Sequence, residues 1–383
     1  MAKKKKKKKT VRAEFRKRHE TRRRKRDFTR EYGEGSDERI DDIASGERIS
    51  GKGQLSRKRT VVGAESDDAS GFQVELQVDP SKCRGGRVLS GHGLTSLVET
   101  EDGQTYECTI RGILKSLATD LQHVVVAGDR VTIQLGDHGE AVIVRVEPRR
   151  NQISRTSRKR QQILVSNVDQ VLIVASAAEP MLKPNLIDRY LVSAEKAGVR
   201  PVIVINKIDL IDSADVQPAI GVWSQLGYNV FLTSAERNLG MEPIRQLVAG
   251  KDSVVTGQSG VGKSSLLNAI RPGLELRVSH VSSENQKGRH TTTVARLIPL
   301  DPDNPEERGH LIDTPGIRQF QLWDVIPEEV AGYFRDIRPF INGCRFPDCT
   351  HTHEEDCNVK WAVADGKLDV RRYESYCQMR EDG

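Results

Sequence analysis

Short segments in which apolar and polar residues alternate run from residue 72 to residue 146, a pattern typical of half-buried β-strands. Turn residues separate these segments, as in Glu101-Asp-Gly103 and Ala127-Gly-Asp129. The predicted strands are 72–78, 86–89, 94–99, 105–110, 130–135 and 141–146. About five short strands in this space predict a small closed β-barrel. An oligonucleotide-binding (OB) fold is the leading candidate, and an SH3-like barrel is the alternative.

After residue 167 the pattern changes to apolar runs that alternate with amphipathic stretches. Strands are predicted at 168–175, 201–205, 229–232 and 253–256, and helices at 185–196 and 241–248. This alternation predicts a mostly parallel sheet that helices cover on both faces. Beyond residue 322 we expect helices on either side of a segment rich in Cys and His.

Charge is distributed very unevenly along the chain. The 383 residues carry a net charge of +6, but residues 1–30 alone hold 17 Lys and Arg against 3 Asp and Glu. Like charges at this density repel and bury no core, so we expect residues 1–30 to be a disordered basic arm, followed by a polar linker to residue 70. A polyanion such as RNA is the expected partner. A solubility tail or a nuclear address is the alternative.

The composition, 36% hydrophobic and 30% charged, is that of a soluble multidomain protein. No stretch approaches the ~18 consecutive apolar residues that crossing a membrane requires, and no apolar stretch follows the basic N-terminus. We therefore expect a cytoplasmic protein without a membrane partner.

A phosphate-binding loop of the form G-x-x-x-x-G-K-[ST] occupies residues 257–264, between a predicted strand and a helical run at 265–270. Its glycines let backbone N–H groups surround phosphates at a helix N-terminus. Lys263 is expected to reach the β- and γ-phosphate oxygens, and Ser264 to bind Mg²⁺. The predicted residues of this site are Gly257, Gln258, Ser259, Gly260, Val261, Gly262, Lys263, Ser264 and Ser265. ATPases and kinases share this motif, so it leaves the base open.

An N-K-x-D motif follows the strand predicted at 201–205 and indicates guanine. The Asp209 carboxylate accepts hydrogen bonds from both N1–H and the 2-amino group of guanine, and leaving it unpaired against adenine costs about 1–3 kcal/mol or more. Asn206 is expected to secure the purine edge or the neighbouring loop, and Lys207 to lie over the ring. The predicted guanine-binding residues are Asn206, Lys207, Ile208, Asp209, Ser234 and Ala235. A chance match is the alternative, which the phosphate loop argues against.

Two further segments have the features of GTPase switches. In Asp313-Thr-Pro-Gly316, Asp313 is expected to reach Mg²⁺ through water, and the Gly316 N–H to contact the γ-phosphate. The first switch is expected at 288–293, where Thr292 or a neighbouring threonine completes the Mg²⁺ site.

The residue after Gly316 is Ile317, where Ras-like GTPases have the glutamine that orients the attacking water. His290 is the nearest candidate for this catalytic role, because a neutral imidazole can position or deprotonate water. The alternative is that His290 only packs within its loop. A potassium-dependent route would need Asn at position 260, which is Gly260.

Three cysteines and a histidine lie within fourteen residues, in the pattern Cys344-x4-Cys349-x-His351-x5-Cys357. Three thiolates and one imidazole suit a closed, structural Zn²⁺ site. His353 is the alternative to His351, and buried free cysteines are the alternative to metal.

These motifs occur in an unusual order, because N-K-x-D precedes the phosphate loop whereas in Ras-like GTPases it follows. The domain is therefore predicted to be circularly permuted, which is tolerable where natural termini lie close together. Together with the zinc spacing, this order makes the chain similar to the RsgA family of small ribosomal subunit biogenesis GTPases. The resemblance covers residue 86 to the C-terminus, including 127–131 and 148–151.

The resemblance implies a multidomain α/β protein that binds the 30S subunit and its 16S rRNA late in maturation and hydrolyses GTP to GDP there, with Mg²⁺ and one Zn²⁺ as cofactors. It assigns the hydrolytic role to His290. The expected parts are a basic arm and linker (1–70), an OB-fold barrel (71–150), a circularly permuted GTPase domain (160–322) and a zinc-binding domain (323–383), in a monomer. An RNA-binding scaffold with a structural nucleotide and a GTPase acting on tRNA are the competing hypotheses.

Overall fold

The computed structural model describes residues 9–14, 58–64, 73–74, 80–92, 95–110, 125–136, 140–157, 160–274, 295–300, 309–313 and 325–381. The chain forms two compact units, one of Met1–Ser81 with Gly112–Thr119 and one of Lys82–Arg111 with Asp120–Gly383. Within the described residues, no helix combines the length and apolar character that a membrane crossing needs.

The first unit contains a three-stranded antiparallel sheet of β1 (Lys9–Glu14), β2 (Lys58–Ala64) and β3 (Gln73–Val74). The prediction of no regular structure over 1–70 therefore fails at β1 and β2, which contain the β-branched pairs Thr10-Val11 and Val61-Val62. The rest of 1–70 lies outside the described residues. The strand predicted at 72–78 is described only at β3.

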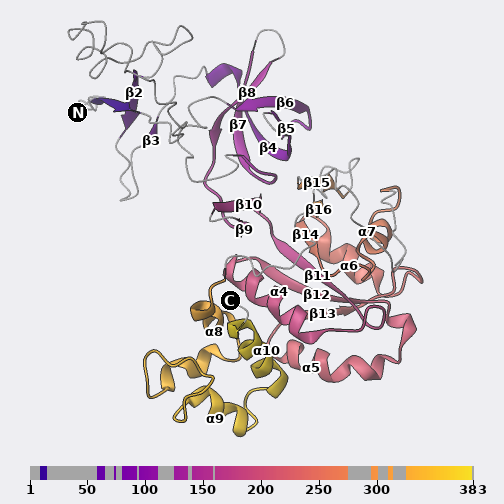
Figure 1. Ribbon diagram of the computed structural model, residues 1–383. Coiled ribbons are helices and arrows are strands. Elements are labelled where there is room, and N and C mark those ends of the chain that lie inside the picture. Colours follow the sequence, from indigo (N-terminus) through magenta and orange to yellow (C-terminus); the bar gives the residue numbers. More distant parts are fainter. Residues whose placement is uncertain are drawn as a thin grey trace, which may run out of the picture. The chain divides into compact units, whose positions relative to one another are not determined.

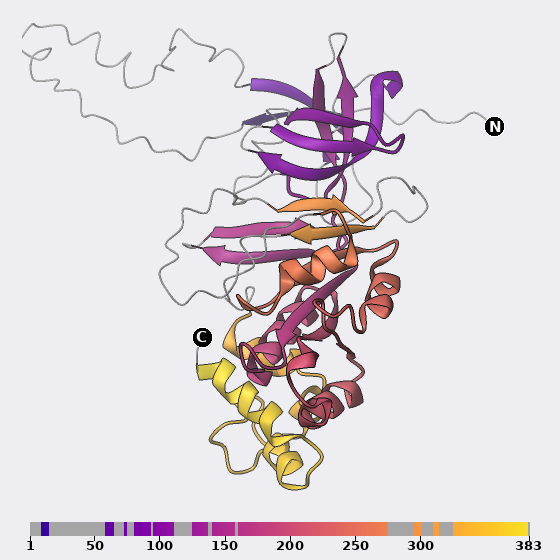
Figure 2. The same cartoon turned by 90° about the vertical axis from the view of Figure 1, so that its right-hand side faces the viewer.

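The second unit begins with a closed five-stranded barrel (Figures 1 and 2). Its strands follow the order β4-β5-β6-β8-β7, and β4 pairs with β7 to close it. The pair β6–β8 is parallel and the others are antiparallel. This order agrees with the predicted OB fold, with strands β4 (Cys83–His92), β5 (Thr95–Thr100), β6 (Thr105–Ile110), β7 (Arg130–Leu135) and β8 (Ala141–Val146).

An antiparallel hairpin of β9 (Gln152–Ser157) and β10 (Arg160–Ser166) follows the barrel. The sequence did not predict it, because the arginines and polar residues of 155–160 give no clear alternation of apolar positions. Arg155 and Arg160 thus lie in paired strands.

The α/β domain contains a six-stranded sheet in the order β13-β12-β11-β14-β16-β15. The first five strands are parallel, as predicted, and β15 is antiparallel to β16. β15 was not predicted from the sequence. The strands are β11 (Gln170–Ser176), β12 (Arg200–Asn206), β13 (Asn229–Leu232), β14 (Asp252–Thr256), β15 (Arg296–Pro299) and β16 (His310–Asp313).

Helices cover both faces of this sheet (Figure 1). On one face, α4 (Pro184–Lys196) and α5 (Gln217–Gln225) pack on a core that includes Ile173 and Ile203. On the other, α6 (Met241–Val248) and α7 (Lys263–Ile270) pack on Leu172, Val174 and their neighbours. Because adjacent residues of β11 enter different cores, the strand is buried on both faces, which explains its unbroken apolar run.

The C-terminal module is helical: η7 (Pro327–Glu329), α8 (Val330–Tyr333), η8 (Arg338–Gly343), α9 (Asn358–Ala364) and α10 (Val370–Glu381). Its core includes Phe334, Ile337 and Tyr376, together with Val192 of α4. The module therefore packs directly on a helix of the α/β domain.

A polar cluster joins the barrel to the α/β sheet. Arg87 of β4 pairs with Asp252 of β14 at 2.5 Å, and Asp252 also contacts Nδ1 of His310 at 2.9 Å. Burial disfavours the charged Asp252 carboxylate, but the contacts with His310 and Arg87 outweigh burial and lower its pKa below the usual value. This cluster lies at the amino ends of β14 and β16, opposite the ends that lead to the phosphate loop and Asp313.

Candidate nucleotide site and metal centre

Four predicted nucleotide-binding segments meet at one edge of the α/β sheet. N-K-x-D begins at the last residue of β12, Thr233-Ser-Ala235 follows β13, the phosphate loop follows β14, and Asp313 ends β16. All four strands are parallel, so their carboxyl ends lie at the same edge. In open α/β sheets this edge is where ligands bind.

Asn206 ties two of these segments together. Its Oδ1 accepts a hydrogen bond from the Ala235 backbone N–H at 3.1 Å and from the Thr233 hydroxyl at 3.3 Å. Its Nδ2 donates to the carbonyl of Val261 in the phosphate loop at 3.0 Å. Asn206 is buried, and its amide oxygen and one N–H donor are engaged in these contacts. Of the two predicted roles, the geometry favours securing the neighbouring loop.

The phosphate loop has a backbone that only glycine accommodates easily. Gly257 has φ +144°, and a Cβ there would lie 2.1 Å from the Val174 carbonyl oxygen; Gly262 has φ +91°, and its Cβ would lie 2.4 Å from Asn206 Nδ2. Lys263 Nζ donates to the carbonyls of Gly257 and Gln258 at 2.7 and 2.6 Å. Lys263 and Ser264 open helix α7, so the loop ends at a helix N-terminus where anions are stabilised.

The N-K-x-D segment has a defined conformation. Lys207 has a left-handed backbone (φ 62°), and its ammonium donates to the carbonyl of Glu179. Asp209 lies in a 3₁₀ turn, η3 (Ile208–Leu210), with only 6% of its side chain exposed. Arg237 Nε lies 3.5 Å from Asp209 Oδ2. The carboxylate expected to read the base is thus shielded and already faces a cation.

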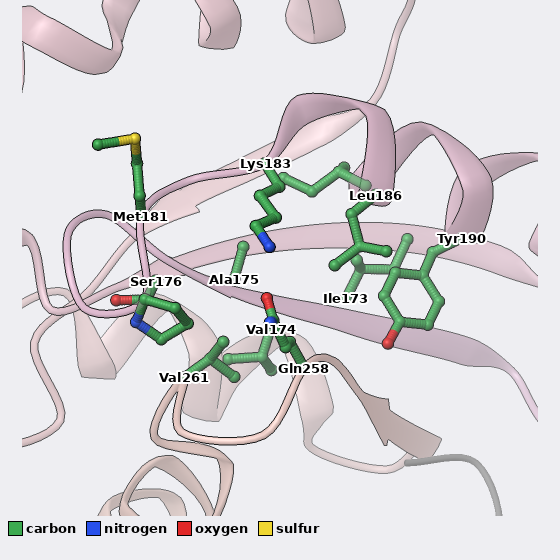
Figure 3. A pocket seen from close by; sticks show the side chains of 12 residues that line it. Ile173, Val174, Ala175, Ser176, Met181, Lys183, Leu186, Tyr190, Gln258 and Val261 are labelled. Carbon is green, nitrogen blue, oxygen red and sulfur yellow. The ribbon is translucent and has the colours of Figure 1, made fainter. Parts of the chain in front are cut away.

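A small cavity lies beside the phosphate loop, between β11 and α4 (Figure 3). Lys183, Leu186 and Tyr190 of the α4 region point toward it from one side, and Gln258 borders it from the phosphate loop. Burial raises the pKa of Tyr190. Helix α4 and the phosphate loop therefore line the same cavity.

Several predicted residues cannot be located in this site. His290, Thr292 and Gly316 lie outside the described residues, and Asp313 is described only as the last residue of β16. Their roles stay predictions.

The three cysteines and His351 form a compact cluster in the C-terminal module. Their ligand atoms all lie within 4.8 Å of one another, a geometry that can hold one metal ion. Cys344 Sγ lies 3.3 Å from His351 Nδ1, and Cys357 Sγ lies 3.5 Å from the same atom. The alternative ligand His353 is not in the cluster, and its side chain is 78% exposed.

The donors of this cluster suit a soft divalent cation. Burial raises the pKa of the Cys349 thiol to about 12 and also raises the pKa of Cys357, while burial lowers the pKa of His351. Burial disfavours the charged thiolate forms, and a bound dication would stabilise them. Three thiols and an imidazole form a ligand set typical of structural zinc.

Hydrogen bonds from outside the cluster hold its loop in place. Glu354 accepts from the Thr350 backbone and hydroxyl at 2.6 and 2.8 Å. Tyr373 and Tyr376 of α10 donate to the carbonyls of His351 and Thr350 at 2.8 and 2.6 Å. Such supporting contacts orient metal ligands.

The sequence did not single out Arg237, Tyr190 or Glu354. Glu354 had a local signal, because an acidic residue shortly after a Cys/His turn often caps backbone N–H groups. Arg237 and Tyr190 have no local signal in the sequence, because their neighbours in space are distant along the chain.

The comparisons with known proteins agree with this architecture. The family model for the RsgA GTPase matches residues 146–323. The small ribosomal subunit biogenesis GTPase RsgA of Gemmatimonas aurantiaca is 42% identical over 303 residues, which cover 78% of this chain and 96% of that protein. The crystal structure of YjeQ from Thermotoga maritima matches with a TM-score of 0.64 and 36% identity, covering 78% of this chain and 98% of that one.

A second solved structure, described as YloQ, a circularly permuted GTPase, matches with a TM-score of 0.60 and 29% identity, over 78% of this chain and 94% of that one. The permuted motif order, the OB-type barrel and the Cys/His cluster thus occur together with a family match over most of the chain. The chain belongs to the RsgA family of circularly permuted GTPases.

Proposed function

We propose that this protein hydrolyses GTP on the small (30S) ribosomal subunit during the late maturation of that subunit. The observation that carries the proposal is the convergence of four nucleotide-binding segments at one sheet edge, two of them tied together by Asn206. The relatives' printed name, small ribosomal subunit biogenesis GTPase, supplies the partner. A protein with this partner works in the cytoplasm, and we propose that it does so as a monomer.

Base selection rests on Asp209. Its carboxylate accepts from N1–H and the 2-amino group of guanine, while the aliphatic part of Lys207 covers the ring. The backbone of Ser234 and Ala235 faces the guanine carbonyl. Because Asp209 is shielded, a base that fails to pair with it leaves a poorly hydrated charge, which is the physical basis of discrimination.

Phosphate binding rests on the loop at 257–264. In the free protein Lys263 binds two carbonyls of its own loop, and with nucleotide it binds the β- and γ-phosphate oxygens. Mg²⁺, when bound, supplies charge neutralisation of these oxygens; Ser264 and Thr292 would hold it directly, and Asp313 through water. The Gly316 N–H contacts the γ-phosphate, and His290 orients the attacking water.

The Cys/His cluster is proposed to hold one Zn²⁺ through Cys344, Cys349, His351 and Cys357. Four protein ligands leave no open coordination position, so this ion is structural. We propose that the zinc-binding domain begins at residue 323, directly after the GTPase domain. The basic arm at 1–30 is proposed to contact 16S rRNA through phosphate neutralisation.

Multiple-turnover hydrolysis of GTP, measured with and without purified 30S subunits, tests the proposal. We expect stimulation by 30S but not by tRNA, and loss of turnover in Lys263→Ala, with Lys360→Ala as a control on the C-terminal module. His290→Ala should lower stimulated turnover by about 10²-fold with little change in GTP affinity. Binding of 30S without turnover would favour the RNA-binding scaffold. Stimulation by tRNA would favour a role in translation.

A further inference from the structure

The loop that follows β13 is held rigidly at both ends. Ser234 and Leu239 exchange two backbone hydrogen bonds of 3.0 Å each, and the Ser234 hydroxyl accepts from the Arg237 N–H at 3.1 Å. Gly240 closes the turn with φ +64°, and a Cβ there would lie 2.1 Å from the Leu232 carbonyl oxygen. The backbone of Arg237 is therefore fixed at the tip of a short, closed turn.

A second arginine secures this turn to the phosphate-loop helix. Arg245 of α6 donates to Asn238 Oδ1 at 2.8 Å and, through Nε and Nη2, to the Ala269 carbonyl near the end of α7 at 3.3 and 2.9 Å. A cation at a helix C-terminus is favourably placed. The residue next to Arg237 is thus tied to the element that follows the phosphate loop.

From this fixed position Arg237 meets the carboxylate that is proposed to read the base. Its Nε lies 3.5 Å from Asp209 Oδ2, with 65% of its own side chain exposed and 6% of that of Asp209. Among the described residues, it forms the one ion pair recorded for Asp209. Lys207, the other cation of this segment, is directed to the carbonyl of Glu179 instead.

We propose that Arg237 is a positioning residue that pairs with the guanine-reading carboxylate and competes with guanine for its Oδ2. This inference rests on the proposed guanine site. Guanine offers two donors and uses both oxygens of Asp209, so it displaces the guanidinium from Oδ2.

Arg237 is largely exposed, so displacing its guanidinium from Asp209 has a small free-energy cost. Exposed ion pairs are weak and are screened by salt. The pair should therefore slow guanine association by about twofold to fivefold at low ionic strength and much less at high ionic strength. Arg237 could instead attract the nucleotide phosphates. In that case removing the cation would slow association, which is the opposite effect on the rate.

Stopped-flow association of a fluorescent N-methylanthraniloyl GDP with the full chain measures this effect. We expect Arg237→Ala to accelerate association by about twofold to fivefold at low salt, with the gain shrinking as salt increases. Arg371→Ala is the matched control, since Arg371 Nε also lies 3.5 Å from a carboxylate, that of Asp369, with 43% exposure and no part in the nucleotide site. Its association rate should equal that of the wild type.

A double-mutant cycle separates competition at Asp209 from any other effect of the charge. In an Asp209→Asn background, with the corresponding xanthosine diphosphate probe, Arg237→Ala should leave association unchanged, because the carboxylate is gone. A slower or unchanged rate in Arg237→Ala, or an acceleration that persists in the Asp209→Asn background, would overturn the inference. A wild-type chain that binds no guanine nucleotide at all would refute the proposed site, an outcome distinct from these.

Discussion

Arg372 is a buried attachment of the C-terminal module to the α/β domain, and its removal should weaken that attachment. The side chain is buried in α10. It donates to Asp188 of α4 at 2.6 Å and forms a bidentate pair with Asp336, both bonds being 2.9 Å. Its guanidinium also lies 4.4 Å from the ring centre of Phe334.

Arg372→Ala would leave two buried carboxylates without their cation. Asp188 keeps a hydrogen bond from Trp223 Nε1 at 3.0 Å, but Asp336 loses both bonds to Arg372. Breaking a buried pair by removing one partner costs about 3–5 kcal/mol. Most of this cost is uncompensated charge, so neutralising the acids should recover part of it.

Hydrogen exchange can measure this loss of stability in the module by itself, because the module and the sheet can open separately. We expect exchange of protected amides in 325–381 to accelerate by about 10²- to 10⁴-fold in Arg372→Ala, following from 3–5 kcal/mol at about 1.4 kcal/mol per tenfold. The exchange rates of amides in β11 and β12 should increase far less. Lys367→Ala, which removes an exposed ion pair with Asp365 inside the module, should match the wild type.

The triple variant Arg372→Met, Asp188→Asn, Asp336→Asn tests the cause of the effect. It removes all three charges and retains much of the side-chain volume, so it should be more protected than Arg372→Ala. Equal loss of protection in the triple and single variants would refute the charge argument. Unchanged protection in Arg372→Ala would refute the attachment itself.

Three further predictions concern the base, the metal and pH. Asp209→Asn should shift preference from guanine to xanthine nucleotides, because an amide donates where the carboxylate accepted; competition binding of GTP and XTP measures the shift. Elemental analysis should find about one Zn²⁺ per chain and none in Cys349→Ser. Asp252→Asn should destabilise the chain at pH 6, and by progressively less as the pH of urea unfolding is lowered below about 3.9. The contacts with His310 and Arg87 lower the pKa of Asp252, so its contribution is fully present above the unfolded value of about 3.9 and is lost as pH falls through the lowered pKa of the folded state.

The binding motifs and their order were predictable from sequence, because each motif has a local cause. The changes from β-barrel to α/β domain and from α/β domain to helical module were predictable for the same reason. A phosphate loop needs glycines at fixed spacing, and a strand buried on both faces needs an unbroken apolar run. The OB barrel needed the structure to separate it from an SH3-like barrel, because the distinction lies in the parallel pairing of β6 with β8. Pairing between distant strands has no local signature.

Arg372 illustrates what the sequence cannot reveal. It stands beside Arg371 in a helix of low apolar content, and nothing nearby marks one arginine as buried and the other as exposed. Its partners, Asp188 and Asp336, lie 184 and 36 residues away along the chain. The same holds for Arg237 and Asp209, whose contact depends on the turn after β13 meeting the turn after β12.

Helix α4 gives the C-terminal module a second connection to the nucleotide site, besides the chain that leads on from Asp313. Asp188 and Tyr190 are two residues apart on α4, so their side chains point to nearly opposite sides of the helix. Asp188 binds Arg372 of the module, whereas Tyr190 lines the cavity that Gln258 of the phosphate loop also borders.

Because the buried Arg372 pairs resist separation, a nucleotide-dependent shift should move α4 and the module together as one body. Hydrogen exchange with GDP and with a non-hydrolysable GTP analogue tests this, on and off the ribosome. We expect differences in 184–196 to appear together with those in 325–345, and Arg372→Ala to abolish the change in the module while leaving the change in α4. A module that responds to nucleotide without any response in α4 would show that the signal travels only through the covalent connection after Asp313.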